Sequence, residues 1–124
     1  MAATVRLGAV GLDCIDPSAL AEFYRRLLDA EIAYANEAFA AIRVGDIWLF
    51  TQRVDDYQRP SWPDGTTPKQ LHLDFAVDDL DEAATHAAAV GAVRAEIQPD
   101  PAKYLVYLDP AGHPFCLSTS FAGR

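Results

Sequence analysis

The chain has 124 residues, 51% of them apolar, and a formal net charge of −8. This length predicts a single domain that buries its own core, and the composition excludes a fibrous or a disordered protein. The ten basic residues are scattered along the chain, which excludes the concentrated positive surface that binds nucleic acids or anionic membranes.

The first half of the chain predicts a strand, a helix and three further strands. An apolar run over 7–14 has the length of a buried strand. Asp16 and Pro17 suit the N-cap and the first turn of the helix, and Gly45-Asp46 suits a hairpin turn. The apolar face of the helix consists of Leu20, Phe23, Tyr24 and Leu27. The three later strands are expected at 30–35, 38–44 and 47–51.

Residues 53–70 form a long irregular stretch between the two halves of the chain. Its helix and strand breakers are Pro60, Pro63, Gly65 and Pro68. These residues disfavour a helix or a central strand. A loop of this length inside a compact domain is typical of a lid or a binding loop.

The second half predicts the same order of elements. A strand is expected over 71–77, and Asp78 is expected to cap the next helix, with Asp81 three residues later. Gly91 suits the end of that helix, and 109–112 suit a turn. The narrow apolar face of the helix consists of Leu80, Ala84 and Ala87. Strands are expected at 92–98, 103–108 and 114–119.

Two short sequence matches support an internal repeat. LDCID at 12–16 matches LDFAVD at 73–78, and GDIWLFTQ at 45–52 matches GHPFCLST at 112–119. We therefore predict an α+β fold of two βαβββ modules, at about 5–53 and 71–120, within a single domain spanning 1–124. The alternative is an α+β domain of unrelated topology.

Three motifs carry a resemblance to a known superfamily. Phe23-Tyr24 precedes Leu27-Leu28 in the first helix, and Asp29 stands where the family usually has Gly. The second half has LHLDFAV at 71–77 and DPAGHPF at 109–115. Together these motifs resemble the glyoxalase/bleomycin-resistance/dioxygenase (vicinal oxygen chelate) superfamily over nearly the whole chain.

The resemblance is strongest to the short glyoxalase-like branch, in which a loop bearing Trp and Pro precedes an HLD strand. Here Trp62-Pro63 precede His72-Leu73-Asp74. The resemblance implies that the two modules form an open, cup-shaped mixed sheet with the helices outside. It also implies a homodimer.

Metal-dependent members of the superfamily hold a cation in the cup, on four positions from the first and last strands of the modules. Carried over by the resemblance, these are Ala9 (or Gly11), Leu49, His72 and Cys116. Alanine, glycine and leucine side chains have no donor atom, and two ligands are too few for a catalytic metal site. We therefore expect no metal cofactor. The alternative is a divalent cation held by His72 and Cys116, with Asp74 as a third ligand.

His72 and Asp74 are the predicted catalytic pair. They lie two residues apart, so a strand presents both side chains on one face, and Asp74 would orient His72 as a general acid or base. The alternative for His72 is a buried structural residue. Cys116 is either a nucleophile or a small buried apolar side chain. Cys14 is expected to point toward the helices.

The remaining candidate residues are predicted to bind a ligand in the cup. Asp13 is a polar anchor near a strand end, and Tyr107 is a further aromatic candidate. The full predicted ligand-binding set is Asp13, Leu49, Tyr57, Trp62, His72, Asp74, Tyr104 and Cys116.

These observations predict a protein that binds a small organic molecule, with bleomycin-binding resistance proteins as the family precedent for sequestration without a metal. The alternative is a small-molecule lyase, isomerase, hydrolase or dioxygenase-type enzyme that uses His72, with or without a metal. A third alternative is a subunit that only dimerises. No apolar run reaches the ~18 residues of a membrane span, and no leader pattern opens the chain, so we expect a cytoplasmic protein.

Overall fold

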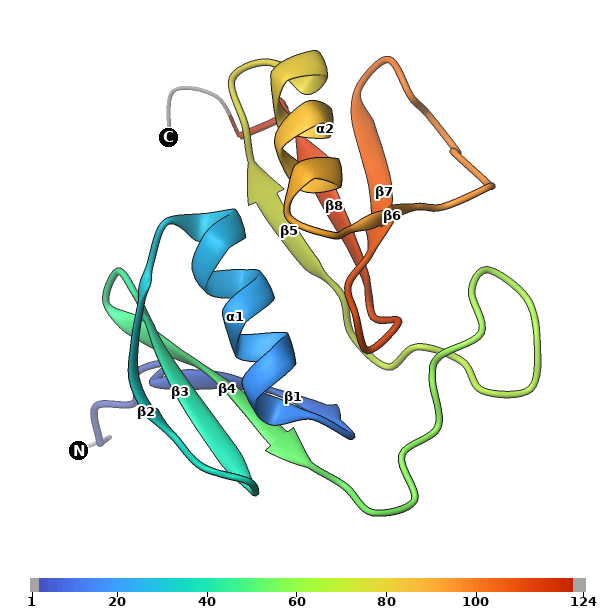
Figure 1. Ribbon diagram of the computed structural model, residues 1–124. Helices are drawn as coiled ribbons and strands as arrows, with labels where there is room; N and C mark the ends of the chain where they lie inside the picture. The colour runs from blue at the N-terminus through green and yellow to red at the C-terminus, as the bar shows by residue number, and fades with distance from the viewer. Residues whose placement is uncertain (1–2, 122–124) are drawn as a thin grey trace. The chain divides into compact units, whose positions relative to one another are not determined.

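A computed structural model describes residues 3–121, and the chain divides into two compact units, with the boundary between Tyr57 and Gln58 (Figure 1). Each unit contains one helix and one four-stranded mixed sheet. The boundary lies inside the irregular stretch predicted over 53–70. We call the units the first and the second module.

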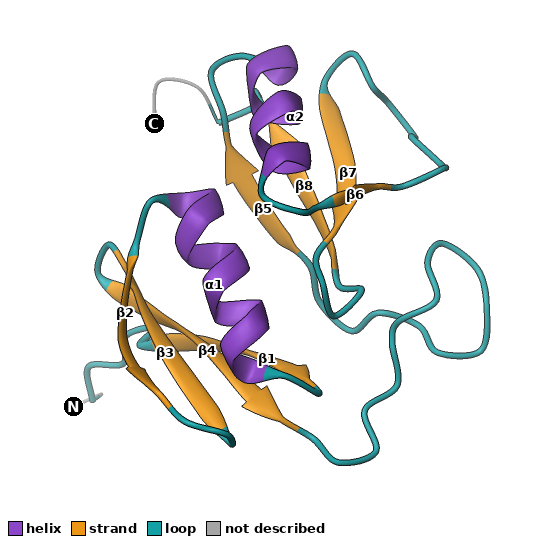
Figure 2. Ribbon diagram, viewed as in Figure 1, coloured by secondary structure: helices purple, strands orange, loops and turns teal. Residues whose placement is uncertain are grey.

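The first module contains five elements in the predicted order. These are β1 (Ala9–Cys14), α1 (Pro17–Leu28), β2 (Glu31–Ala35), β3 (Phe39–Val44) and β4 (Ile47–Arg53). The strand order in the sheet is β1-β4-β3-β2 (Figure 2). β1 and β4 run parallel, and the other neighbouring strands run antiparallel.

The second module repeats this topology with shorter strands. Its elements are β5 (Leu73–Ala76), α2 (Leu80–Ala89), β6 (Val93–Arg94), β7 (Tyr104–Leu108) and β8 (Pro114–Ser118). The strand order is β5-β8-β7-β6, with β5 parallel to β8. The predicted α+β class and the two βαβββ modules are therefore confirmed.

Helix α1 begins after an N-cap side chain and ends at a residue in the left-handed conformation. The Asp16 carboxylate accepts a hydrogen bond from the Ala19 N–H at 3.1 Å, which confirms the predicted N-cap. Asp29 ends the helix in the left-handed conformation, with φ of 51°. Glycine is the usual residue there, and Asp is one of the few others that tolerates it. Leu20 and Tyr24 are each 1% exposed, so the apolar face packs on the sheet.

Helix α2 begins one residue later than predicted. Its N-cap is Asp79, not Asp78, because the Asp79 carboxylate accepts the N–H of Glu82 at 3.0 Å. Ala87 is its one buried residue. An alanine removes little apolar area from water, so α2 gains less stability from packing than α1 does.

The predicted strand over 92–98 is wrong after Arg94, because a side chain takes over the role of the strand backbone. The Gln98 amide nitrogen donates to the Val106 carbonyl at 2.8 Å, and the Gln98 amide oxygen accepts from the Val106 N–H at 2.9 Å. The Val106 carbonyl also accepts the Ala95 N–H at 3.1 Å, so backbone pairing reaches Ala95, and the Gln98 side chain replaces a strand partner at the Val106 N–H. The chain then turns away through Pro99 and Pro101.

The turn between β7 and β8 is organised by a buried carboxylate. Asp109 is 2% exposed, and its Oδ1 accepts from the N–H groups of Ala111 and His113, both at 2.9 Å. Gly112 has φ of +86°, which a side chain rarely adopts. Arg59 donates to the Pro110 carbonyl at 3.0 Å, so the loop after the first module is attached to this turn.

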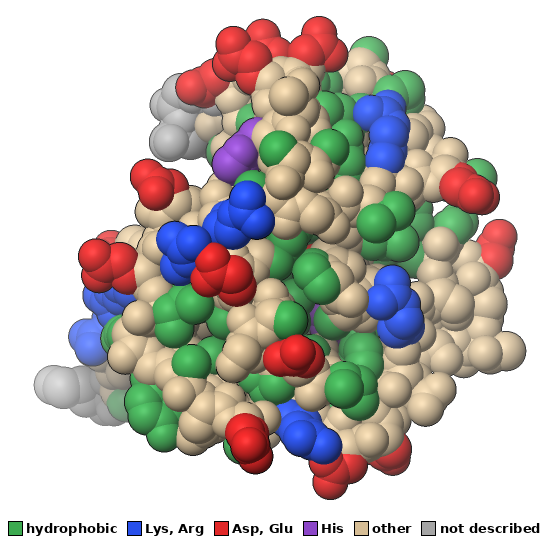
Figure 3. All heavy atoms as spheres, in the orientation of Figure 1, with side chains coloured by type: hydrophobic (Ala, Val, Ile, Leu, Met, Phe, Trp, Pro, Cys, Tyr) green, Lys and Arg blue, Asp and Glu red, His purple; other side chains and the backbone are tan. Residues whose placement is uncertain are grey.

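The surface charge agrees with the sequence. On the face shown in Figure 3, Lys and Arg side chains are dispersed among acidic and polar ones. Within residues 3–121, neither helix has the length and hydropathy needed to cross a bilayer.

Candidate functional site

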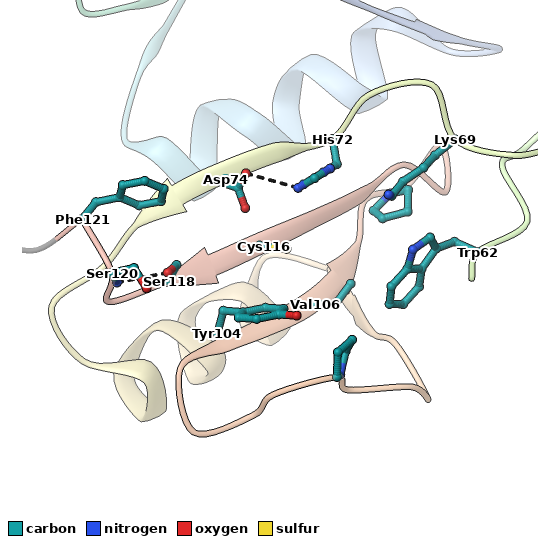
Figure 4. Close-up of a pocket in the computed structure, with 12 residues that line it drawn as sticks. Trp62, Lys69, His72, Asp74, Tyr104, Val106, Cys116, Ser118, Ser120 and Phe121 are labelled. Atoms are coloured by element: carbon teal, nitrogen blue, oxygen red, sulfur yellow. Dashed lines mark hydrogen bonds and ion pairs between the residues drawn. The ribbon is translucent and has the colours of Figure 1, made fainter. Parts of the chain in front are cut away.

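A cavity of about 330 Å³ lies in the second module, against the face of the sheet opposite α2 (Figure 4). β7 and β8 both contribute to it, and side chains alternate along a strand, so every second residue reaches the cavity. Its charged and polar side chains are Lys69, His72, Asp74, Cys116, Ser118 and Ser120. Its aromatic and apolar side chains are Trp62, Pro99, Tyr104, Val106, Pro114 and Phe121.

The parallel pairing of β5 and β8 assembles the polar floor of the cavity. Asp74 and Cys116 are direct partners across the two strands. His72 precedes Asp74 by two residues, and its Nε2 lies 3.2 Å from Asp74 Oδ2. The two side chains are 38% and 41% exposed, so both are accessible from the cavity. The contact predicted between this pair is present.

Cys116 is held as a neutral thiol. Burial raises the pKa of Cys116 to about 11, and the negative charge of Asp74 and a hydrogen bond to Asp74 add to this effect. A protonated thiol is a poor nucleophile and must lose its proton to ligate a metal. This environment favours the structural role for Cys116 over the nucleophilic one.

The four metal positions implied by the resemblance do not fit a metal. His72 stands seven residues before the N-cap Asp79, and Ala9 stands seven residues before the N-cap Asp16, so Ala9 rather than Gly11 is its counterpart. Ala9 has no donor atom. Asp74, two residues after His72, pairs with Cys116, and Gly11, two residues after Ala9, pairs with Phe50, so the strand register makes Phe50 rather than Leu49 the counterpart of Cys116. Neither a phenylalanine nor a leucine side chain has a donor atom.

A different donor set is present within the second module alone. One ligand atom each from His72, Asp74 and Cys116 lie within 4.8 Å of one another. Three protein ligands can hold a catalytic metal, but here a cation must first displace the thiol proton.

The aromatic wall of the cavity is anchored to the module core. Trp62 and Tyr104 pack against Val106 and Cys116. Ser61 fixes the loop beside Trp62, because its hydroxyl donates to the Thr67 carbonyl at 3.1 Å and accepts from the Thr67 N–H at 2.9 Å. The loop predicted as a lid or binding loop therefore carries a residue of the cavity wall.

The predicted ligand-binding residues divide between the modules. Trp62, His72, Asp74, Tyr104 and Cys116 all line the cavity. The other three candidates lie in the first module and do not line it.

Those three residues have different surroundings. Asp13 is exposed on β1, Leu49 is 4% exposed within β4, and Tyr57 is half-buried at the end of the module. Their predicted contact with a ligand stays a prediction. Tyr107 is 3% exposed and stacks on Phe115 with ring centroids 6.2 Å apart, so it belongs to the core.

Sequence reasoning missed several lining residues. Ser118 follows Cys116 by two positions in β8, so strand alternation was a sufficient signal for it. Lys69 lies in an irregular segment where no periodicity indicates the direction of a side chain. Phe121 follows the last strand and is 40% exposed.

The comparisons with known proteins point to one family. Residues 9–118 match the family described as glyoxalase-like domain. No curated protein is significantly similar in sequence.

Solved structures share the fold at low identity. The fosfomycin resistance protein FosX from Mesorhizobium loti is 18% identical, with a TM-score of 0.68 over 98% of this chain and 95% of that chain. A FosX mutant from Listeria monocytogenes, complexed with Mn(II) and a dihydroxypropylphosphonic acid, is 15% identical with a TM-score of 0.72, over 97% and 96% of the chains. Lactoylglutathione lyase from Agrobacterium tumefaciens is 20% identical with a TM-score of 0.63, over 93% of each chain.

Proposed function

Because the chain belongs to the glyoxalase-like domain family, we propose that it binds a small organic molecule in the cavity of the second module, without a divalent metal. The observation that carries this proposal is the cavity itself, which combines an aromatic wall with a short row of polar groups. Ligand sites in proteins are typically apolar hollows with a few placed polar groups. The volume of about 330 Å³ is at the lower end of the usual range, which favours a molecule of one or two rings.

The donor chemistry supports the metal-free part of the proposal. Ala9 and Leu49 offer no ligand atoms. The Cys116 thiol has a pKa of about 11, so it keeps its proton at neutral pH. The Mn(II) in the listerial FosX complex belongs to a protein only 15% identical.

Metal analysis of protein purified without chelators tests this point. We expect well below one equivalent of Fe, Mn, Ni or Zn per chain, and no change in thermal stability on adding EDTA. A stoichiometric metal that is lost in His72→Ala but retained in His86→Ala would overturn the metal-free proposal. His86 is a suitable control because it lies on α2, outside the cavity lining.

A second candidate function is catalysis by His72, and the 3.2 Å contact with Asp74 favours it. A carboxylate that orients an imidazole is a common arrangement for a general acid or base. The reaction class would be that of a lyase, isomerase or hydrolase acting on a small molecule. His72→Ala separates the two functions: a variant that keeps ligand affinity and loses turnover supports the enzyme, and a protein without turnover supports the binder.

Two further expectations belong to the same proposal. The resemblance favours a homodimer, which sedimentation equilibrium tests directly. Cytoplasmic localisation is likewise proposed, and fractionation of cells that express the tagged chain tests it.

A further inference from the structure

Lys69 is a charged group in the cavity whose partner is not supplied by the described chain. It is half-buried and lines the cavity together with Trp62 and His72. Within residues 3–121 its ammonium makes no hydrogen bond or ion pair. A partly desolvated charge without a partner costs free energy, which a ligand of opposite charge would recover.

The Lys69 side chain extends from the loop into the same space as the polar floor (Figure 4). Its positive charge is close enough to Cys116 to lower the pKa of that thiol slightly, against the larger effects of burial and of Asp74. The ammonium therefore acts on the cavity interior.

Asp74, the acidic residue of the cavity, differs from Lys69 in having neighbouring polar groups. The Asp74 carboxylate already has two neighbours, since His72 Nε2 lies 3.2 Å from it and the Cys116 thiol lies within 4.8 Å of it. A cationic ligand would have to compete with these neighbours for Asp74. An anionic ligand would meet an unpaired ammonium.

We propose that the ligand is an aryl organic acid, whose carboxylate pairs with Lys69 while its ring lies against Trp62 and Tyr104. This inference rests on the proposed function and names the chemical class of its ligand. The ring has a suitable surface, because both aromatic side chains are packed on the module core. A charge-assisted hydrogen bond to the carboxylate supplies the selectivity for an acid.

The experiment compares three probes with the same ring and different charge: phenylacetate, phenylacetamide and 2-phenylethylammonium. Calorimetry with the full chain measures their dissociation constants. We expect phenylacetate to bind about ten- to a hundredfold more tightly than the neutral amide, the usual contribution of a hydrogen bond to a charged group. The ammonium probe should bind more weakly than the amide.

The variant Lys69→Met is expected to remove the preference for the acid and to leave the amide affinity nearly unchanged. Lys69→Arg keeps the positive charge and should retain most of the preference for the acid over the amide. Lys103→Met is the matched control, because Lys103 is 73% exposed, pairs with Asp100 and lies outside the cavity lining. It should preserve the preference.

The outcomes distinguish the two proposals. Equal or tighter binding of the amide or the ammonium probe would overturn the acid assignment while supporting a ligand-binding cavity. A preference for phenylacetate over the amide that is retained in Lys69→Met would also overturn the assignment. If Trp62→Ala leaves the affinity of every probe unchanged, both the acid assignment and the cavity proposal are wrong.

Discussion

The two modules share one topology and differ in what their equivalent positions carry. In the first module, α1 buries five residues and the strands hold mostly apolar or small side chains. In the second, α2 buries one alanine, while His72 just before β5, Asp74 in β5 and Cys116 in the middle of β8 come together. The first module therefore has the better packed helix, and the second module has the polar side chains of the candidate site.

The same contrast explains why a metal centre shared by both modules is not expected. By the strand register, Ala9 and Phe50 occupy the positions that correspond to His72 and Cys116, and neither these two residues nor Leu49 contributes a ligand atom. A site made by the second module alone can be tested by variants confined to that module.

The largest expected effect concerns the two helices. Leu20 on α1 is 1% exposed, so Leu20→Ala should lower the free energy of unfolding by about 2–5 kcal/mol. Leu80→Ala on α2 should cost about 1 kcal/mol or less, because Leu80 is only half-buried. Urea denaturation measures both changes. Equal losses would contradict the unequal packing of the two helices.

The next effect concerns the turns that join the last two strands of each module. Asp109→Ala removes the acceptor of two backbone N–H groups, and we expect a loss of about 1–3 kcal/mol in the free energy of unfolding. The first module makes the equivalent connection with Gly45 and the exposed Asp46. Asp46→Ala should therefore stay within about 0.5 kcal/mol of the parent. A similar loss for both variants would show that the buried carboxylate has no special role.

The smallest effect concerns the Cys116 thiol. With a pKa of about 11, roughly one thiol in a thousand is ionised at pH 8, so iodoacetamide should modify Cys116 slowly. Asp74→Asn removes the negative charge, lowers the pKa and should speed modification several-fold, while burial keeps the pKa above its ordinary value of 9.0. Peptide mapping by mass spectrometry separates Cys116 from Cys14. Asp13→Asn, in the first module, is the control and should change nothing.

The same shift has a consequence for stability. The folded state holds the Cys116 proton more tightly than the unfolded chain does. The contribution of this group to the free energy of unfolding is therefore complete below pH 9.0 and declines as the pH rises toward about 11. Cys116→Ala should flatten this part of the pH profile of unfolding. A profile that is unaltered in Cys116→Ala would contradict the raised pKa.

Much of the fold could be predicted because the signals are local. The N-cap Asp16, the apolar face of α1 and the Gly45 turn act through neighbours in the chain, and the structure confirms the element order that they indicate. The two errors have different causes. The strand after α2 ends early because the Gln98 side chain pairs with the Val106 backbone. The predicted cap is one residue too early because Asp78 and Asp79 are adjacent carboxylates with the same local signal.

The candidate site was predictable only in part. His72 and Asp74 are two residues apart, so strand periodicity places them on one face wherever the strand pairs. The partnership of Asp74 with Cys116 depends on the register of β5 against β8, and Lys69 joins them through a loop without periodicity. Short-range backbone geometry thus follows from the residue order. The convergence of loop, strand and C-terminal side chains on one cavity follows from packing among segments far apart in the chain.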